Sequence, residues 1–231
     1  MEFEFSNISK ILERNADKWP DDVALVEINP QELESRRATW RDYSLIESSP
    51  VDKFRSELTW AAFDEKANRF ANFLLSRGLK RGDKVAILLM NCIEWLPIYF
   101  GVLKAGCMAV PLNFRYSSDD IKYCLDLADV EVLVFGPEFV SRIDTIAGDL
   151  DFLKMKFFVG KNGPAYSEDC MRLVGFCSSS APPVALTEDD HAAIYFSSGT
   201  TGFPKAILHD HRSLNCACMV EQNHHGQTRA D

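Results

Sequence analysis

The sequence predicts an α/β fold in which helices flank a largely parallel sheet. Short apolar runs, typical of strands buried on both faces, alternate with segments whose apolar residues recur at helical spacing. This alternation predicts strand–helix–strand units that form one sheet with helices on both faces. With 231 residues, of which 46% are hydrophobic, the chain is long enough to bury a substantial core.

The first 57 residues are less regular than the rest. Between Asn29 and Glu57 the chain is polar and charge-rich, and it offers little continuous apolar surface. Three elements are predicted here: a helix over Phe5–Ala16, a strand over Val23–Ile28 and a hairpin arm around Ala38–Tyr43.

From Thr59 onward, strands and helices alternate. Thr59 can cap a helix with one apolar face, and Gly78 lies where a C-terminal cap belongs. Ser117, followed three residues later by Asp120, forms a variant of the capping box at the start of a second helix. The other predicted elements are strands over Lys84–Met90, Cys107–Leu112, Val130–Phe135 and Met155–Val159, and helices over Ile93–Lys104 and Phe139–Ala147.

The last third of the chain begins with a predicted loop over Lys161–Leu186, which is rich in Ser and Pro towards its end. Ala192–Phe196 is predicted to be a short strand, and Ala206–Leu208 is apolar again. We find no terminal cap or ending helix before Asp231, so the sequence is expected to stop within a domain.

Charge and cysteine content exclude some classes of function. The formal net charge of −9 argues against a nucleic-acid partner, which normally requires a basic surface. No secretory signal is visible, and no apolar stretch reaches the roughly 20 residues that span a bilayer, so no transmembrane segment is predicted. Seven cysteines in mostly apolar surroundings are typical of reduced thiols in a cytoplasmic protein.

The segment from Ser197 to Lys205 concentrates groups that bind phosphate. Gly199 and Gly202 let the backbone turn and approach a ligand closely, and Lys205 adds a positive charge. Four hydroxyl groups come from Ser197, Ser198, Thr200 and Thr201. The spacing of the glycines and Ala206 after the lysine exclude a Walker A loop. By composition alone, a surface turn that happens to contain a lysine is an equal alternative.

The full string Tyr195-Phe-Ser-Ser-Gly-Thr-Thr-Gly-Phe-Pro-Lys205-Ala closely resembles the phosphate-binding signature of the adenylate-forming superfamily. That family comprises acyl-CoA synthetases, adenylation domains of peptide synthetases and firefly-type luciferases. Further segments resemble the family in the same order: Leu58-Thr-Trp60, Arg81-Gly-Asp-Lys-Val85, Leu103-Lys-Ala-Gly106 and Val110-Pro-Leu-Asn-Phe-Arg115. His211 matches a histidine commonly found a few residues after the loop.

The resemblance implies that the chain is an incomplete N-terminal AMP-binding domain, without the C-terminal lid domain. Residues 1–57 would form the N-terminal helix and hairpin arm, and residues 58–186 an α/β subdomain. Residues 187–231 would begin the next subdomain and carry the phosphate-binding loop.

The resemblance also implies an activity, that of an ATP-dependent carboxylic acid–CoA ligase. Such an enzyme uses ATP and Mg²⁺ to convert an acid to an acyl-adenylate with release of pyrophosphate, and then forms the CoA thioester. By position, Ser197, Ser198, Gly199, Thr200, Thr201 and Gly202 would cradle the β- and γ-phosphates. Thr200 or Thr201 would orient phosphate or its Mg²⁺, and Lys205 would be the catalytic residue that neutralises the departing pyrophosphate.

Later family signatures, for adenine, ribose and the acyl pocket, are absent from the chain, so it is expected to be inactive by itself. Two alternatives stay open. One is an amino-acid-adenylating domain of the same family. The other is a catalytically dead module that binds only nucleotide or a partner, including self-association through surface exposed by truncation.

Several other groups are predicted to be structural. Cys216 and Cys218 lack the spacing of a zinc site. Four histidines lack a nucleophile or acid partner at diagnostic spacing and are expected to be exposed or to cap helices. They are His209, His211, His224 and His225. Glu188–Asp190 is expected to be a solvated turn. The set Trp60, Phe63 and Phe70 is expected in the core.

Overall fold

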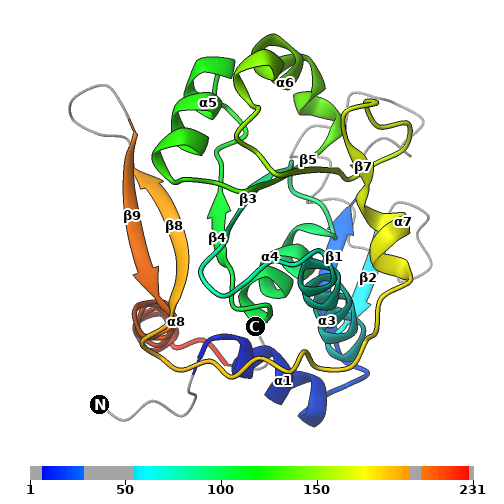
Figure 1. The fold of residues 1–231 in the computed structure, drawn as a ribbon. Helices are drawn as coiled ribbons and strands as arrows, with labels where there is room; N and C mark the ends of the chain where they lie inside the picture. Colours follow the sequence, from blue (N-terminus) through cyan, green and yellow to red (C-terminus); the bar gives the residue numbers. More distant parts are fainter. Residues whose placement is uncertain (1–6, 29–54, 198–203, 229–231) are drawn as a thin grey trace.

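The computed structural model describes residues 7–28, 55–197 and 204–228 (Figure 1). Its strands are β1 (Val23–Ile28), β2 (Arg55–Thr59), β3 (Lys84–Leu88), β4 (Met108–Pro111), β5 (Val132–Phe135), β6 (Met155–Phe158), β7 (Glu168–Asp169), β8 (His191–Ser197) and β9 (Lys205–Asp210). Its α-helices are α1 (Ser9–Lys18), α3 (Trp60–Ser76), α4 (Trp95–Lys104), α5 (Ser118–Leu127), α6 (Val140–Ile146), α7 (Cys170–Gly175) and α8 (His211–His225). Two short 3₁₀ helices are η2 (Pro137–Phe139) and η3 (Ala147–Asp149). The hairpin arm predicted around Ala38–Tyr43 lies outside the described residues.

The strands form a seven-stranded sheet in the order β7-β6-β5-β3-β4-β8-β9, and a separate antiparallel pair, β1 and β2. Neighbouring strands of the large sheet are parallel from β7 to β8, and only β9 runs antiparallel to its neighbour. The predicted fold class is therefore confirmed. Because β8 pairs with β4 in the same sheet, the proposed division at residue 187 lies within one sheet and stays a prediction.

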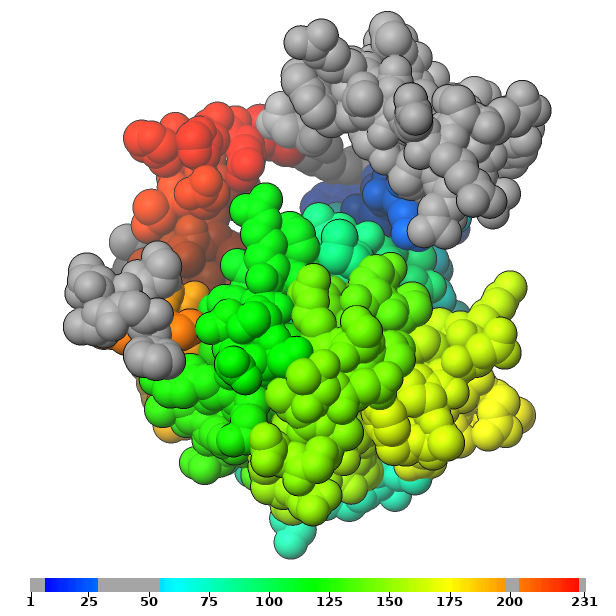
Figure 2. All heavy atoms as spheres, turned by 90° about the horizontal axis from the view of Figure 1, so that it is seen from above, coloured from blue at the N-terminus to red at the C-terminus, as the bar shows by residue number. Residues whose placement is uncertain are grey.

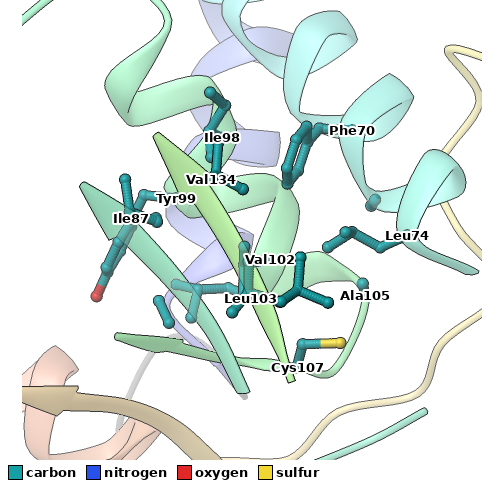
Figure 3. Close-up of a cluster of buried hydrophobic side chains, with 14 of the residues drawn as sticks. Phe70, Leu74, Ile87, Ile98, Tyr99, Val102, Leu103, Ala105, Cys107 and Val134 are labelled. Carbon is teal, nitrogen blue, oxygen red and sulfur yellow. The ribbon is translucent and has the colours of Figure 1, made fainter. Parts of the chain in front are cut away.

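The central strands send alternate side chains to opposite faces of the sheet. Val85 and Ile87 pack with α3 and α4, whereas Ala86 and Leu88 pack with α5 and α6. Figure 3 shows the first of these clusters, in which side chains from α3 and α4 meet those of the strands. Burial on both faces explains why these strands are continuous apolar runs in the sequence.

The predicted helix boundaries follow from local hydrogen bonds. The Thr59 side chain accepts from the backbone N–H of Ala62 at 3.2 Å, and Gly78 has a φ of 82° just beyond α3. At α5, the Ser117 hydroxyl accepts from the N–H of Asp120 at 3.2 Å, and the Asp120 carboxylate accepts from the N–H of Ser117 at 3.0 Å. All three predicted caps are confirmed.

The contact between α3 and α4 is close because α4 contains a glycine at the crossing. A Cβ added to Gly101 would lie 2.7 Å from the Cβ of Phe70 and 2.8 Å from the carbonyl oxygen of Ala67. Phe63 and Phe70 are buried as predicted, whereas Trp60 is half-buried at the rim.

The same helices enclose a buried lysine, Lys104, whose side chain is 2% exposed. Its Nζ donates to Oδ1 of Asp64 at 2.6 Å and to Oδ1 of Asn68 at 2.8 Å, and it lies 3.4 Å from the Glu13 carboxylate. The ammonium thus joins α1, α3 and α4, and the partners offset the cost of burying its charge.

The prediction that Lys161–Leu186 is a loop throughout is wrong. The segment contains β7, which extends the sheet beside β6, and α7, which Asp169 caps by accepting from the N–H of Arg172 at 3.0 Å. Cys170, at the start of α7, is fully buried. β7 has two residues and α7 has six, too few to show a clear periodicity, and the neighbouring sheet and α3 decide their structure.

The expectation that no ending helix or terminal cap precedes Asp231 is wrong, because α8 follows β9. Asp210 caps α8 by accepting from the N–H of Ser213 at 2.7 Å, and Gly226 ends the helix in the left-handed conformation with a φ of 62°. The helix has many polar residues, so its apolar periodicity is weak. None of the described helices is long and apolar enough to cross a bilayer.

Candidate phosphate-binding site

The hairpin formed by β8 and β9 lies at one edge of the large sheet (Figure 1). Its last pair of opposed residues is Ser197 and Lys205. The predicted phosphate-binding segment therefore begins and ends at the same end of this hairpin. Ser198, Gly199, Thr200, Thr201 and Gly202 lie outside the described residues, and their roles stay predictions.

The base of the hairpin is anchored in the core. Ile194 is buried, and Tyr195 and Phe196 pack against the clusters on opposite faces of the sheet. The hydroxyl groups of Tyr195 and Tyr99 are 2.7 Å apart, which ties β8 to α4. Because β8 is held by these contacts, the backbone at Ser197 leaves the core in a defined direction.

Lys205 is the only described charged residue of the predicted phosphate-binding segment, and it is exposed. No carboxylate among the described residues lies within ion-pairing distance of its ammonium group. Across the hairpin, Ser197 is half-buried. The hairpin end thus combines an accessible ammonium group with a hydroxyl group, which suits a polyanion.

His211, which follows β9, was expected to be exposed or to cap a helix, and it is buried beside the start of α1. Its side chain is 1% exposed, and its Nδ1 accepts from the backbone N–H of Ile8 at 3.4 Å. The backbone N–H of His211 donates to the carbonyl oxygen of Asp190 at 3.0 Å. Burial lowers the pKa of His211 to about 4, so the ring is neutral at pH 7 and joins α1 to the start of α8.

The other three histidines differ from one another. The His209 ring is half-buried and lies edge-on to Tyr195, with centroids 5.3 Å apart. His224 and His225 are exposed near the end of α8, as expected. The His209 Nδ1 also lies 3.4 Å from the Ser213 hydroxyl, which in turn donates to the carbonyl oxygen of Asp210 at 2.9 Å.

The acidic turn Glu188–Asp190 is held by arginines. Asp190 forms an ion pair with Arg81, and Arg212 lies 2.8 Å from Glu188 and also contacts Asp189. The pairs of Arg212 link the start of α8 to the turn before β8, and the pair of Arg81 links that turn to the segment before β3. In the part of the chain that the structure describes, no group of three or more His, Cys, Asp or Glu side chains is arranged to hold a metal ion.

The contact between Tyr99 and Tyr195 was not foreseen from the sequence. The two residues are 96 positions apart, and only the strand order, with β8 beside β4, brings α4 to β8. Tyr195 lies inside the recognised segment, but nothing in its spacing identifies its partner.

The family profile described as "AMP-binding enzyme" matches residues 12–231. Human mitochondrial acyl-coenzyme A synthetase ACSM2B is 30% identical over 178 residues, which are 76% of this chain and 31% of that protein. The 3-hydroxybenzoate–CoA/4-hydroxybenzoate–CoA ligase of Thauera aromatica is 31% identical over 170 residues. The match covers 73% of this chain and 32% of that ligase. The chain thus spans about a third of the length of these curated relatives.

Solved structures show the same fold. The anthranilate CoA ligase AuaEII in complex with anthranoyl-AMP superposes with a TM-score of 0.78 at 23% identity, over 95% of this chain and 37% of that one. A long-chain-fatty-acid–CoA ligase (FadD1) from Archaeoglobus fulgidus gives a TM-score of 0.78 at 17% identity, over 99% of this chain and 41% of that one.

Proposed function

Because the chain belongs to the AMP-binding enzyme family, we propose that it forms the phosphate-binding part of an ATP-dependent carboxylic acid–CoA ligase. The complete enzyme would convert an acid to its acyl-adenylate with release of pyrophosphate, and then transfer the acyl group to CoA. One observation carries the proposal: Ser197 and Lys205 face each other at the end of an anchored hairpin, on either side of the Ser/Thr/Gly-rich segment.

The reaction has to bring two anions together. A carboxylate attacks the α-phosphate of ATP, and negative charge then builds up on the leaving pyrophosphate. Fixed positive charge and preorganised N–H donors stabilise such a transition state. Lys205 supplies the charge, since it is exposed and is unpaired among the described residues. A rigid hairpin base reduces the motion that would otherwise weaken this effect.

The remaining roles rest on the recognised segment. The backbone N–H groups and hydroxyls of Ser197, Ser198, Gly199, Thr200, Thr201 and Gly202 would hold the β- and γ-phosphates. Mg²⁺, when bound with ATP, would neutralise phosphate charge, and the hydroxyls of Thr200 or Thr201 would orient it. Hydroxyl and phosphate oxygens are ligands that Mg²⁺ prefers.

The proposal is tested by measuring carboxylate-dependent pyrophosphate release from ATP and Mg²⁺. The 231-residue chain and the longest natural reading frame of its gene would be compared with straight-chain acids of increasing length and with benzoates. We expect release from the longer protein and little or none from the chain alone. Lys205→Ala should lower the rate by about 10²–10³-fold, the usual effect of removing one transition-state contact.

Two variants control this test. Lys205→Arg keeps a positive charge and should retain more activity than Lys205→Ala, whereas Lys161→Ala removes an exposed charge in another part of the chain and should change nothing. Thermal unfolding separates catalysis from folding, because Lys205→Ala should leave Tm unchanged. Unfolding of Lys205→Ala, or full activity in that variant, would show that the lysine does not have the proposed role.

A second function is favoured by the outer edge of the sheet. In β9, Ile207 and Leu208 are 43% and 50% exposed, and Val220 of α8 is 59% exposed. Such an edge can pair with another chain. A module without activity, which binds nucleotide or associates with itself or a partner, would show concentration-dependent sedimentation and no acid-dependent pyrophosphate release from either protein.

A reducing compartment suits the cysteines. All seven are free, and Cys107, Cys124 and Cys170 are buried. Burial raises the pKa of the Cys107 and Cys124 thiols to about 12, so they are unreactive. We therefore place the protein in the cytoplasm, and recovery of the natural protein in a secreted or membrane fraction would contradict this.

A further inference from the structure

A pocket of about 150 Å³ opens between α3, α4 and α7. It belongs to the β7 end of the sheet, because α7 follows β7 directly and packs against α3 and β6. The hairpin of β8 and β9 lies at the other end of the sheet (Figure 1). In Figure 2 the yellow segment that contains α7 likewise forms the flank away from α8, in red. The pocket is therefore separate from the proposed phosphate site.

The floor of this pocket is apolar. It is lined by Phe70 of α3, Ile98 of α4, and Met171 and Val174 of α7. An engineered apolar cavity of about 150 Å³ in another protein binds benzene. The pocket thus has the volume and the lining that suit one phenyl ring.

A phenyl ring of the chain itself lies beside the pocket. Phe176 directly follows Gly175, which lines the pocket, and its side chain is 83% exposed. Among the described residues it is the most exposed large apolar side chain. Because Phe176 is so exposed, it does not fill the pocket of its own chain. Aromatic side chains that stand free on a surface are the usual anchors of protein–protein contacts.

The backbone of Phe176 is held on both sides. The Arg69 guanidinium donates to the carbonyl oxygen of Gly175 at 3.4 Å and to that of Cys177 at 2.5 Å. The N–H of Phe176 itself donates to the carbonyl oxygen of Leu173 at 3.3 Å. A side chain presented from a fixed backbone loses less conformational entropy when a partner covers it.

The charges at the rim indicate what kind of partner fits. Lys66 and Arg69 of α3 line the pocket together with Glu94, which precedes α4, so the rim carries both signs of charge. A second copy of the chain carries the same mixed rim and can place its Glu94 near Lys66 of the first copy. A partner of a single sign would be repelled by part of the rim. A ring and a pocket on one surface are also self-complementary about a two-fold axis.

We propose that two copies of this chain associate across a two-fold axis through this surface, with Phe176 of each copy in the α3–α4–α7 pocket of the other. The contact is small and belongs to the weak, transient class of interface, with a Kd on the order of 10 µM. None of its residues belongs to the hairpin that carries the proposed phosphate site. The dimer therefore stands or falls independently of the ligase function.

Sedimentation velocity of the 231-residue chain tests the proposal. We expect a monomer at about 1 µM and a dimer at about 100 µM. Phe176→Ala should raise the dimer Kd by about 10²–10³-fold, because each dimer loses two aromatic anchors. Phe152→Ala, which removes a phenylalanine that is 40% exposed elsewhere on the surface, is the matched control and should leave the Kd unchanged. A chain that stays monomeric at all concentrations, or a dimer that persists in Phe176→Ala, would overturn the proposal.

A second pair of variants separates the pocket from other apolar surfaces. A Cβ added to Gly175 would have no other heavy atom of the fold within 4 Å, so Gly175→Leu can narrow the pocket without a clash and should weaken the dimer. Leu208→Asp changes the exposed edge strand β9 and should leave the dimer intact. Loss of the dimer in Leu208→Asp but not in Phe176→Ala would assign the association to the sheet edge and contradict the proposal. Thermal unfolding at about 1 µM, where the chain is monomeric, should be the same for Phe176→Ala as for the unchanged chain.

Discussion

The centre of the sheet and its β8–β9 edge treat a buried polar side chain in opposite ways. Lys104 of α4 and Asn215 of α8 are each 3% exposed. The Lys104 ammonium has close partners in Asp64 and Asn68, at 2.6 and 2.8 Å, whereas the Asn215 amide has no partner among the described residues. The first arrangement holds three helices together. The second leaves the Nδ2 and Oδ1 atoms of Asn215 buried without a hydrogen bond in the described part of the chain.

The strands show a similar contrast, in the burial of their side chains. Val85 to Leu88 of β3 are fully buried, whereas Ile207 and Leu208 of the edge strand β9 are about half exposed. Stability is thus concentrated at the centre of the sheet, and the groups that suit ligand binding lie at the β8–β9 edge. Such a division is common, because binding segments need accessible atoms on a rigid support.

The largest effect on stability is expected at the centre. Phe135 of β5 is fully buried and lies against Phe158 with ring centroids 5.5 Å apart. Phe135→Ala should lower the free energy of unfolding by about 3–5 kcal/mol, since it removes apolar contacts and leaves a cavity. Phe176→Ala is the control, because Phe176 is 83% exposed and should change stability by less than about 0.5 kcal/mol. Denaturant titration measures both, and equal effects would refute the contrast.

A pH-dependent effect is expected where α8 meets α1. The pKa of His211 is lowered from 6.5 to about 4, mainly by burial, with Arg81 lowering it and Asp210 raising it. The unfolded chain therefore binds a proton more readily between these values. Stability due to neutral His211 is complete above pH 6.5 and is lost as the pH falls towards 4, by about 3 kcal/mol.

His211→Gln removes this titration and should flatten the dependence of Tm on pH between 7 and 4. His225→Gln, which changes an exposed histidine of the same helix, should leave the dependence as it is. An unchanged pH profile in His211→Gln would mean that the buried ring does not couple protonation to unfolding.

The buried lysine and the buried asparagine should respond with opposite signs. Lys104→Met leaves the Asp64 carboxylate and the Asn68 amide without their shared donor, and it should destabilise the chain by about 2 kcal/mol. The value is below that of a fully buried pair, because the Asp64 side chain is 18% exposed and can regain water. Lys66→Met, at a less buried position of α3, is the control, and chemical denaturation measures the difference.

Asn215→Leu should stabilise the chain, by about 1 kcal/mol, because it replaces unpaired polar atoms with apolar ones of similar volume. This is the smallest expected change, and differential scanning calorimetry can resolve it as a rise in Tm. A fall in Tm comparable to that of Lys104→Met would show that the Asn215 amide is already hydrogen-bonded in solution, and the contrast between the two sites would disappear.

Much of the fold could be predicted because its signals are local. The continuous apolar run at Val85 to Leu88, the cap at Thr59 and the capping box at Ser117 and Asp120 each act within a few residues. The recognised segment ending at Lys205 likewise indicated the family, and the comparisons confirm that indication. Its individual roles stay predictions.

Other features depended on contacts between distant residues. The helix α7 is short, and α8 is so polar that its periodicity is weak. Packing therefore decides both, for α7 against α3 and β6 and for α8 against β9. His211 was expected to be exposed or to cap a helix, yet its ring is buried and accepts from the backbone N–H of Ile8, 203 residues away. Likewise, no sequence spacing reveals that Tyr99 meets Tyr195.

Local sequence patterns thus specified the parallel sheet, and the segment ending at Lys205 indicated the family, whereas the hairpin that carries Lys205 is a finding of the structure. The folded chain decided which polar groups are satisfied: Lys104 meets acids from two other helices, whereas the Asn215 amide has no partner among the described residues. The physical reason is that hydrogen bonding and burial depend on which surfaces meet in space. That is settled by the order of strands in the sheet and by the packing of helices on it, and not by the neighbours of a residue along the chain.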